Sequence, residues 1–127
     1  MTEQTGSSDN GSLSAGSRPV SAVERDRGAT VVSLAGELDL YNADEVRQAL
    51  HACSAEGPAR LVVDLSGVTF IDSTALGVLI EARSEMADHG AFLLAAPGLE
   101  TRRALEVSGL DRHFTVHETL DEALAAD

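Results

Sequence analysis

Along this 127-residue chain, apolar residues recur alternately with the period of a strand and the period of a helix. Valine-rich segments at Val20–Arg25 and Ala29–Ala35 flank a turn at residues 26–28, which predicts a β-hairpin. Two nearly continuous apolar segments, Arg60–Leu65 and Ala91–Ala96, are typical of strands buried on both faces. Strands that alternate with helices predict an α/β layer with mainly parallel central strands.

Segments with the apolar spacing of a helix lie between these strands. Asn42, with Glu45 three residues later, predicts the capped start of a helix that Gly57 and Pro58 end. A turn at Ser66 and Gly67 precedes a second helix, expected from near Ser73 to about His89. The remaining expected elements are a helix at Leu99–Ser108 ended by Gly109, a short strand at Phe114–Val116 and a helix at Thr119–Ala126. The whole predicts a mixed central sheet of four to five strands, opened by an antiparallel hairpin, with about four helices.

Composition divides the chain into a tail and one domain. Eight of the first nineteen residues are Gly or Ser, so we expect residues 1–19 to be disordered and residues 20–127 to fold. Neither a secretion signal nor a membrane-spanning run is apparent, and the single cysteine, Cys53, suits a reducing interior. We therefore expect a cytoplasmic protein that does not bind membranes.

The charged residues exclude several functions. All nine basic residues are arginine, so the chain lacks the lysine of a Walker-type phosphate loop, of a Schiff base or of a lysine general base. Because 21 acidic residues give a net charge of −12, direct binding to nucleic acid is not expected. The spacing of Cys and His residues does not fit a zinc site. We expect no cofactor and no metal.

Three short polar residues, Asp72, Ser73 and Thr74, lie between an apolar strand and a long apolar helix. Such side chains satisfy the free N–H groups at a helix start, so Asp72 or Ser73 fits a purely structural cap. A hydroxyl there also lies where open α/β sheets bind ligands, and a phosphate on it would face the positive end of the helix dipole. The residues alone leave both interpretations open.

Two segments resemble the STAS domain of bacterial anti-sigma factor antagonists. The first is D-L-S-G-V-T-F-I-D-S-T at residues 64–74, continued by Leu76-Gly77-Val78-Leu79. The second is Gly36-Glu37-Leu38-Asp39, followed by Asn42-Ala43-Asp44 and an amphipathic helix. The resemblance extends from about Val20 to Ala126 in matching order. Many members have Gly where this chain has Ala75, a better helix former that the helix should tolerate.

The resemblance implies a protein-binding switch without catalysis. In that family, the serine that matches Ser73 is phosphorylated by an anti-sigma factor serine kinase. The unphosphorylated form binds this kinase and so frees a sigma factor, the phosphorylated form releases it, and a metal-dependent serine phosphatase resets the switch. The implied partner-binding residues are Asp39, Asp72, Ser73, Thr74, Leu76 and Gly77. We expect a monomer or weak dimer.

Three other functions compete with this one. A phospho-aspartate receiver would use Asp64, but it needs a late lysine and an acidic pair after the first strand, which the chain lacks. A nucleotide hydrolase needs a glycine-rich phosphate loop. A STAS regulatory subunit of a transporter, lipid-trafficking or stressosome-like assembly remains open as the alternative.

Several further residues have structural interpretations. Cys53 fits a small core residue, and His51, His89, His113 and His117 fit surface or partly packed positions. Leu76, Leu79 and Ile80 are expected mainly in the core. Val78 places apolar surface on another side of the same helix and is a candidate partner contact.

Overall fold

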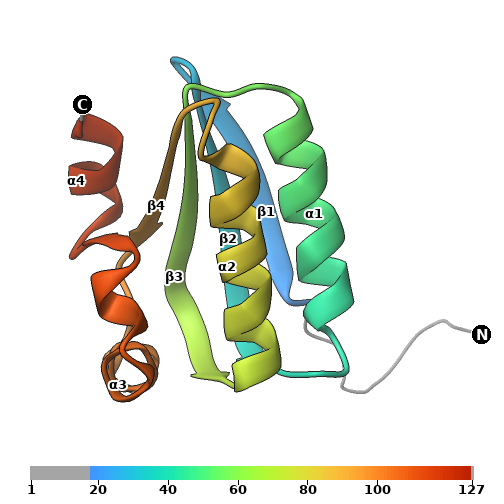
Figure 1. Cartoon of the computed structure of the whole chain (residues 1–127), viewed down its shortest axis with the longest axis vertical. Helices are drawn as coiled ribbons and strands as arrows, with labels where there is room; N and C mark the ends of the chain where they lie inside the picture. The colour runs from blue at the N-terminus through green and yellow to red at the C-terminus, as the bar shows by residue number, and fades with distance from the viewer. Residues whose placement is uncertain (1–17, 127) are drawn as a thin grey trace, which may run out of the picture.

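The computed structural model describes residues 18–126. Five strands, four α-helices and one short 3-10 helix follow one another along them (Figure 1). Their bounds are β1 Val20–Asp26, β2 Ala29–Leu38, α1 Ala43–Ala55, β3 Arg60–Ile71, α2 Ser73–Met86, β4 Ala91–Ala95, α3 Leu99–Ser108, η1 Leu110–Arg112, β5 Thr115–His117 and α4 Leu120–Ala125.

The strands form one sheet in the order β1-β2-β3-β4-β5. β1 pairs with β2 antiparallel, and every later neighbouring pair is parallel. The hairpin turn places Arg27 and Gly28 at φ angles of 53° and 84°, as a two-residue turn that follows the strand twist requires. The mixed sheet opened by a hairpin is therefore confirmed.

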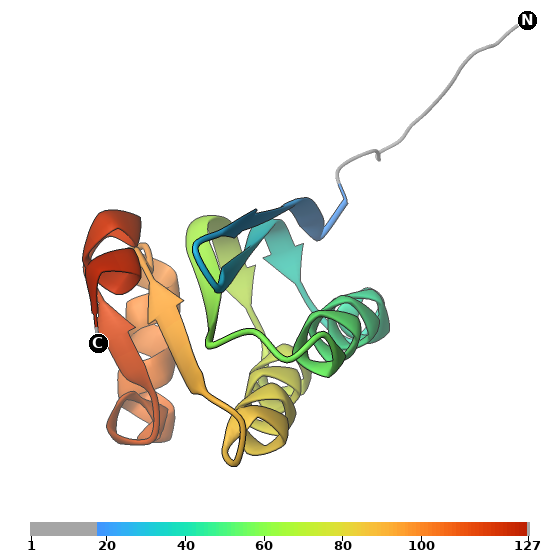
Figure 2. The ribbon, with the colours of Figure 1, turned by 90° about the horizontal axis from the view of Figure 1, so that it is seen from above.

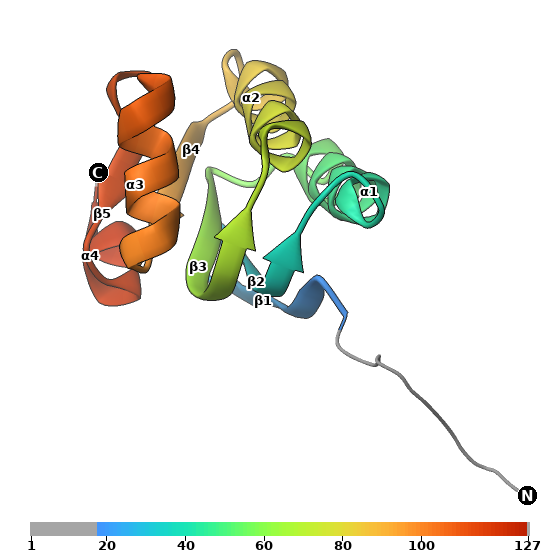
Figure 3. The same cartoon turned by 90° about the horizontal axis from the view of Figure 1, so that it is seen from below.

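Helices cover the sheet unequally. α1, α2 and α3 lie along one face, and α4 lies on the other face beside β4 and β5 (Figures 2 and 3). The larger core fills the space under the first three helices and includes Leu61, Leu94 and Cys53, which confirms the buried position expected for the cysteine. A smaller cluster, with Val62 and Ala123, packs under α4.

β3 differs most from its prediction, because it continues to Ile71 instead of ending at Leu65. Its pairing with β2 shifts between Asp64 and Gly67 and again before Phe70, so the expected turn is a bulge within the strand. The Asp64 carboxylate accepts a hydrogen bond from the Ser66 amide at 3.0 Å. Local turn chemistry is thus present, but strand pairing overrides it.

Two helix ends also differ from prediction. α1 begins after Asn42 as expected, but the Asn42 side chain does not cap it. Instead, the Asn42 Oδ1 accepts from the Asp39 amide at 2.9 Å, and its Nδ2 donates to the Glu37 carbonyl at 2.8 Å. α2 ends at Met86 and not near His89, because the chain must turn back to bring Gly90 close to the Ala59 carbonyl.

The expected tail, residues 1–19, lies outside the described residues except for Arg18 and Pro19. These two residues contact the domain: the Pro19 carbonyl accepts from the Ala35 amide at 2.9 Å, and Arg18 pairs with Glu45 at 3.0 Å. Within residues 18–126, no helix is both long and apolar enough to cross a bilayer.

Candidate functional site

The candidate site lies where β2 and β3 end and α1 and α2 begin, at the lower end of the molecule in Figure 1. Asp39 directly follows β2, and Asp72 directly follows β3. The Asp72 amide donates to the Leu38 carbonyl at 3.0 Å, so the two strand ends are joined. The structure therefore brings together two segments that the sequence analysis singled out separately.

Asp72 binds both segments through its carboxylate. Its Oδ1 accepts from the Ala75 amide at 3.0 Å, which confirms the predicted cap of α2. Its Oδ2 accepts from the Leu40 amide at 3.2 Å, in the loop between β2 and α1. Sequence analysis missed this second bond, because the two residues lie 32 positions apart and no local pattern relates them.

The loop between β2 and α1, residues 39–42, is ordered by its own hydrogen bonds. The Asp39 carboxylate accepts from the Tyr41 amide at 3.0 Å, and the Asp39 carbonyl accepts from the Asn42 and Ala43 amides at 3.2 and 2.9 Å. Asp39 therefore acts as a turn carboxylate at the predicted edge of the sheet, close to the start of α2.

Ser73 and Thr74 are the first two residues of α2, and both are exposed. Each hydroxyl lies at the positive end of a 14-residue helix. A group added to either oxygen would point outward and would need no rearrangement of the core. The arrangement offers an accessible phosphoacceptor.

The outer face of α2 continues this exposed edge. A Cβ built on Gly77 meets nothing within 4 Å, so the surface there is open. One turn further on, Ile80 is 41% exposed, whereas Val78 is only 1% exposed. Two expectations were therefore wrong: Val78 does not supply apolar surface, and Ile80 does not lie in the core. The reason is that α2 packs against α1 as well as the sheet.

The neighbouring residues Ala75 and Leu76 face inward. Leu76, expected both in the core and as a partner contact, is 7% exposed and belongs to the large core cluster. A side chain packed in this way offers a partner almost no area, so Leu76 drops out of the candidate surface. The Ala75 methyl group is also buried, which means that Ala in place of Gly changes the core side of α2 and not its outer face.

The histidines and the cysteine lie elsewhere. His51 pairs with Glu85 at 3.1 Å on the surface, and the Nε2 atom of the partly buried His117 has no hydrogen-bond partner. Burial raises the pKa of the Cys53 thiol, which keeps it uncharged and unreactive. The described part of the chain contains no group of three His, Cys, Asp or Glu residues able to hold a metal ion.

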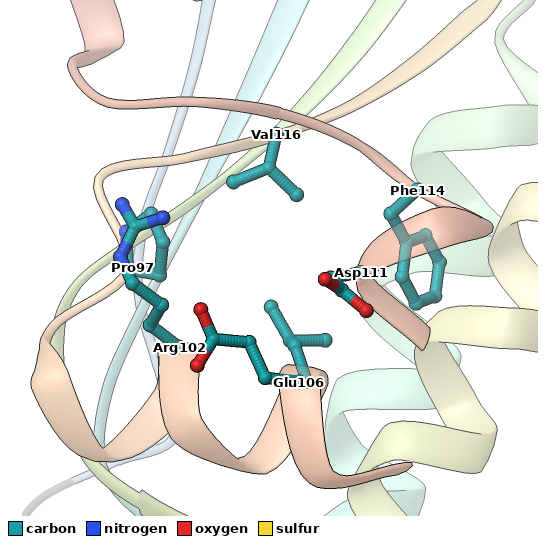
Figure 4. Close-up of a pocket in the computed structure, with 7 residues that line it drawn as sticks. Pro97, Arg102, Glu106, Asp111, Phe114 and Val116 are labelled. Carbon is teal, nitrogen blue, oxygen red and sulfur yellow. The ribbon is translucent and has the colours of Figure 1, made fainter. Parts of the chain in front are cut away.

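A cavity of about 320 Å³, which sequence analysis did not anticipate, opens beside α3 (Figure 4). Arg102, Glu106 and Asp111 line it together with the apolar residues Pro97, Leu105, Phe114 and Val116. Its wall holds no hydroxyl, thiol or imidazole group. It could not be predicted, because α3, η1 and β5 form it jointly and none of them has a distinctive motif.

Comparison with known proteins identifies the family. The STAS domain family matches residues 21–123. The anti-sigma-F factor antagonist RsfB of Mycobacterium tuberculosis is 36% identical over 97 residues, which cover 76% of this chain and 80% of that protein. The anti-sigma-B factor antagonist of Listeria monocytogenes is 35% identical over 89 residues, 68% of this chain and 77% of that protein.

A solved structure agrees with these relatives. The crystal structure of an anti-sigma factor antagonist from Mycobacterium paratuberculosis superimposes with a TM-score of 0.77 at 39% identity, covering 81% of this chain and 88% of that one. The resemblance carried by residues 64–79 and 36–44 is therefore confirmed in both sequence and fold. This chain belongs to the STAS domain family.

Proposed function

We propose that this protein is a cytoplasmic anti-sigma factor antagonist, without catalytic activity of its own, that is switched by phosphorylation at Ser73. In the unphosphorylated form, the candidate site at the ends of β2 and β3 binds an anti-sigma factor serine kinase, and the sigma factor held by that kinase is freed. Phosphorylation of Ser73 abolishes the binding, and a serine phosphatase restores it. The observation that carries this proposal is the exposed Ser73 hydroxyl at the start of α2, directly after Asp72.

The surroundings of Ser73 support an electrostatic and steric switch. Phosphorylation adds about −1.5 to −2 charges. These charges would lie at an edge that already carries Asp39 and Asp72, in a chain with a net charge of −12. The dipole of α2 favours a phosphate at its N-terminus, so the fold can keep its shape while a docked partner is displaced.

A phosphorylation experiment tests the proposal. The purified protein is incubated with ATP and candidate anti-sigma factor kinases, and the phosphate is mapped by mass spectrometry. We expect the phosphate on Ser73, no incorporation in Ser73→Ala, and a phosphate that stays on Ser73 in Thr74→Ala. The second variant is a matched control, because Thr74 is the adjacent exposed hydroxyl.

Two outcomes would contradict this function. The first is a phosphate confined to a residue other than Ser73. The second is copurification with a permease or a lipid-transport subunit together with failure to bind any anti-sigma factor kinase, which would favour a regulatory STAS subunit.

A further inference from the structure

Two large apolar side chains stand out in solvent beside the proposed phosphorylation site. Leu40 is 61% exposed and Tyr41 is 88% exposed, on the loop whose Leu40 amide is bound by Asp72. Their exposure shows that neither side chain packs in the core, whereas Leu38 and Ala43, on either side of the loop, are buried. Two such side chains next to each other offer a partner an apolar contact.

The backbone under these side chains is held rigidly. Hydrogen bonds anchor the amides of all four loop residues: the Asp39 amide to Asn42, the Leu40 amide to Asp72, and the Tyr41 and Asn42 amides to Asp39. A backbone held in this way loses little conformational freedom when the loop binds a partner. Tyrosine in particular contributes strongly to protein interfaces through its large, stiff ring.

The charge around the loop indicates the chemistry of the partner. Residues 37–45 contain Glu37, Asp39, Asp44 and Glu45 and no basic residue. Glu45 pairs with Arg18, and Asp44 pairs with Arg47, which also pairs with Glu81. Glu37, Asp39 and the nearby Asp72, by contrast, have no ion-pair partner within residues 18–126. A complementary surface would therefore combine an apolar cleft with lysine or arginine side chains on its border.

We infer that Leu40 and Tyr41 form an apolar anchor that inserts into a basic-bordered cleft of the kinase named in the proposed function, on which this inference rests. Asp72 is the positioning residue, because one carboxylate caps α2 next to Ser73 and holds the anchor loop at the same time. The kinase therefore contacts the phosphorylation site and the anchor together, and its affinity for this protein depends on both.

Substitution of the anchor tests the inference through the kinase affinity, measured by isothermal titration calorimetry with the full chain. We expect Tyr41→Ser to weaken binding about tenfold or more, and Leu40→Ser to weaken it less. Val107→Ser is the matched control: Val107 on α3 is 83% exposed, so its loss should change affinity less than about twofold. Because neither anchor side chain packs in the core, all three variants should unfold at the wild-type temperature.

Asp72→Asn tests the positioning role. Asparagine caps helices as well as aspartate does, but its Nδ2 cannot accept from the Leu40 amide. We expect faster hydrogen exchange at the Leu40 amide and weaker kinase binding, with thermal stability largely retained. Thr119→Ala is the control, since it removes the cap of α4, an Oγ1 bond from the Glu122 amide at 3.1 Å, without touching the anchor loop. It should lower stability and leave kinase affinity unchanged.

The outcomes separate the two proposals. If wild-type protein binds the kinase and Tyr41→Ser binds equally well, the anchor is refuted while the proposed function stands. Unchanged Leu40 exchange and kinase affinity in Asp72→Asn would refute the positioning role. If the wild-type protein binds no anti-sigma factor kinase, the proposed function fails, and the partner inferred here fails with it.

Discussion

The two ends of the parallel sheet are built in opposite ways. At the end where the parallel strands begin, the loops pack backbone to backbone: the Gly28 carbonyl accepts from the Ala59 amide at 2.8 Å, and the Ala59 carbonyl accepts from the Ala91 amide at 3.0 Å. A Cβ on Gly90 would lie 2.4 Å from that same Ala59 carbonyl oxygen. At the other end, Tyr41 is exposed and the surface over Gly77 is open.

Loop order does not distinguish these two ends, because the loop amides are hydrogen-bonded at both, to carbonyls at the first end and largely to side chains at the second. They differ in what the side chains do. The first end uses small residues and close packing to connect strands, whereas the second displays a hydroxyl, two apolar side chains and a glycine that its own packing does not require. Because the fold does not need these groups for its stability, they are available to bind a partner.

The largest effect on stability is expected from closing the space at Gly90. In Gly90→Ala, the new methyl group collides with a backbone oxygen that cannot move aside, so we expect a loss of about 1–3 kcal/mol in the free energy of unfolding. Urea unfolding measures this loss. Kinase affinity per folded molecule should not change, and an equally stable variant would show that this end is packed less tightly than described.

Gly77→Ala is the matched substitution at the other end, and it should act in the opposite direction. Alanine in a helix interior is more favourable than glycine by about 0.5–1 kcal/mol, and the added methyl group meets nothing within 4 Å. We therefore expect higher stability together with weaker kinase binding, because the methyl group occupies open surface beside Ser73. A stabilised variant with full affinity would remove Gly77 from the partner surface.

The smallest effect on stability is expected from loss of the Arg25–Glu56 ion pair, at the end where the parallel strands begin. The hydrogen bonds from Arg25, at 2.9 and 2.8 Å, lower the pKa of Glu56 below its ordinary value of 4.5. The ion pair therefore stabilises the folded protein at pH values above that ordinary pKa, and this stabilisation is lost as the pH falls through the lowered pKa. Because both side chains are exposed, the contribution is small.

An NMR titration of the Glu56 carboxyl measures this shift. In Arg25→Gln the pKa should return toward the ordinary value, and kinase affinity should stay constant. A Glu56 pKa that is unaffected by the substitution would show that the ion pair does not form in solution.

Much of the fold was predictable because local chemistry and tertiary structure agree. α3 spans Leu99–Ser108 as predicted, and Gly109 ends it at a φ of 78°, a conformation that glycine adopts without strain. β3 was not predictable, since Ser66 and Gly67 carry turn chemistry that pairing with β2 converts into a bulge. The end of α2 was misplaced because Gly90 marks a close backbone approach and not the helix end.

The candidate site was predictable in its residues but not in its connections. Motif resemblance located Asp39, Asp72 and Ser73 in the chain. The bond from the Leu40 amide to Asp72 joins distant segments, so no local pattern reveals it. Val78 is buried and Ile80 is exposed, contrary to prediction, because α2 packs against α1 as well as against the sheet. Its buried face is therefore wider than that of a helix that packs on the sheet alone.

The most direct measurement of the central claim is the affinity of an anti-sigma factor kinase for Ser73→Ala, Ser73→Asp and the enzymatically phosphorylated protein. We predict that Ser73→Ala binds as tightly as the wild type. Ser73→Asp should bind at least about tenfold more weakly, and the phosphorylated protein more weakly still, since it carries more charge. Thr74→Asp, which adds the same charge one residue further on, should lose less affinity. Equal affinities of Ser73→Ala, Ser73→Asp and the phosphorylated protein would contradict the claim that this edge is a switched binding surface.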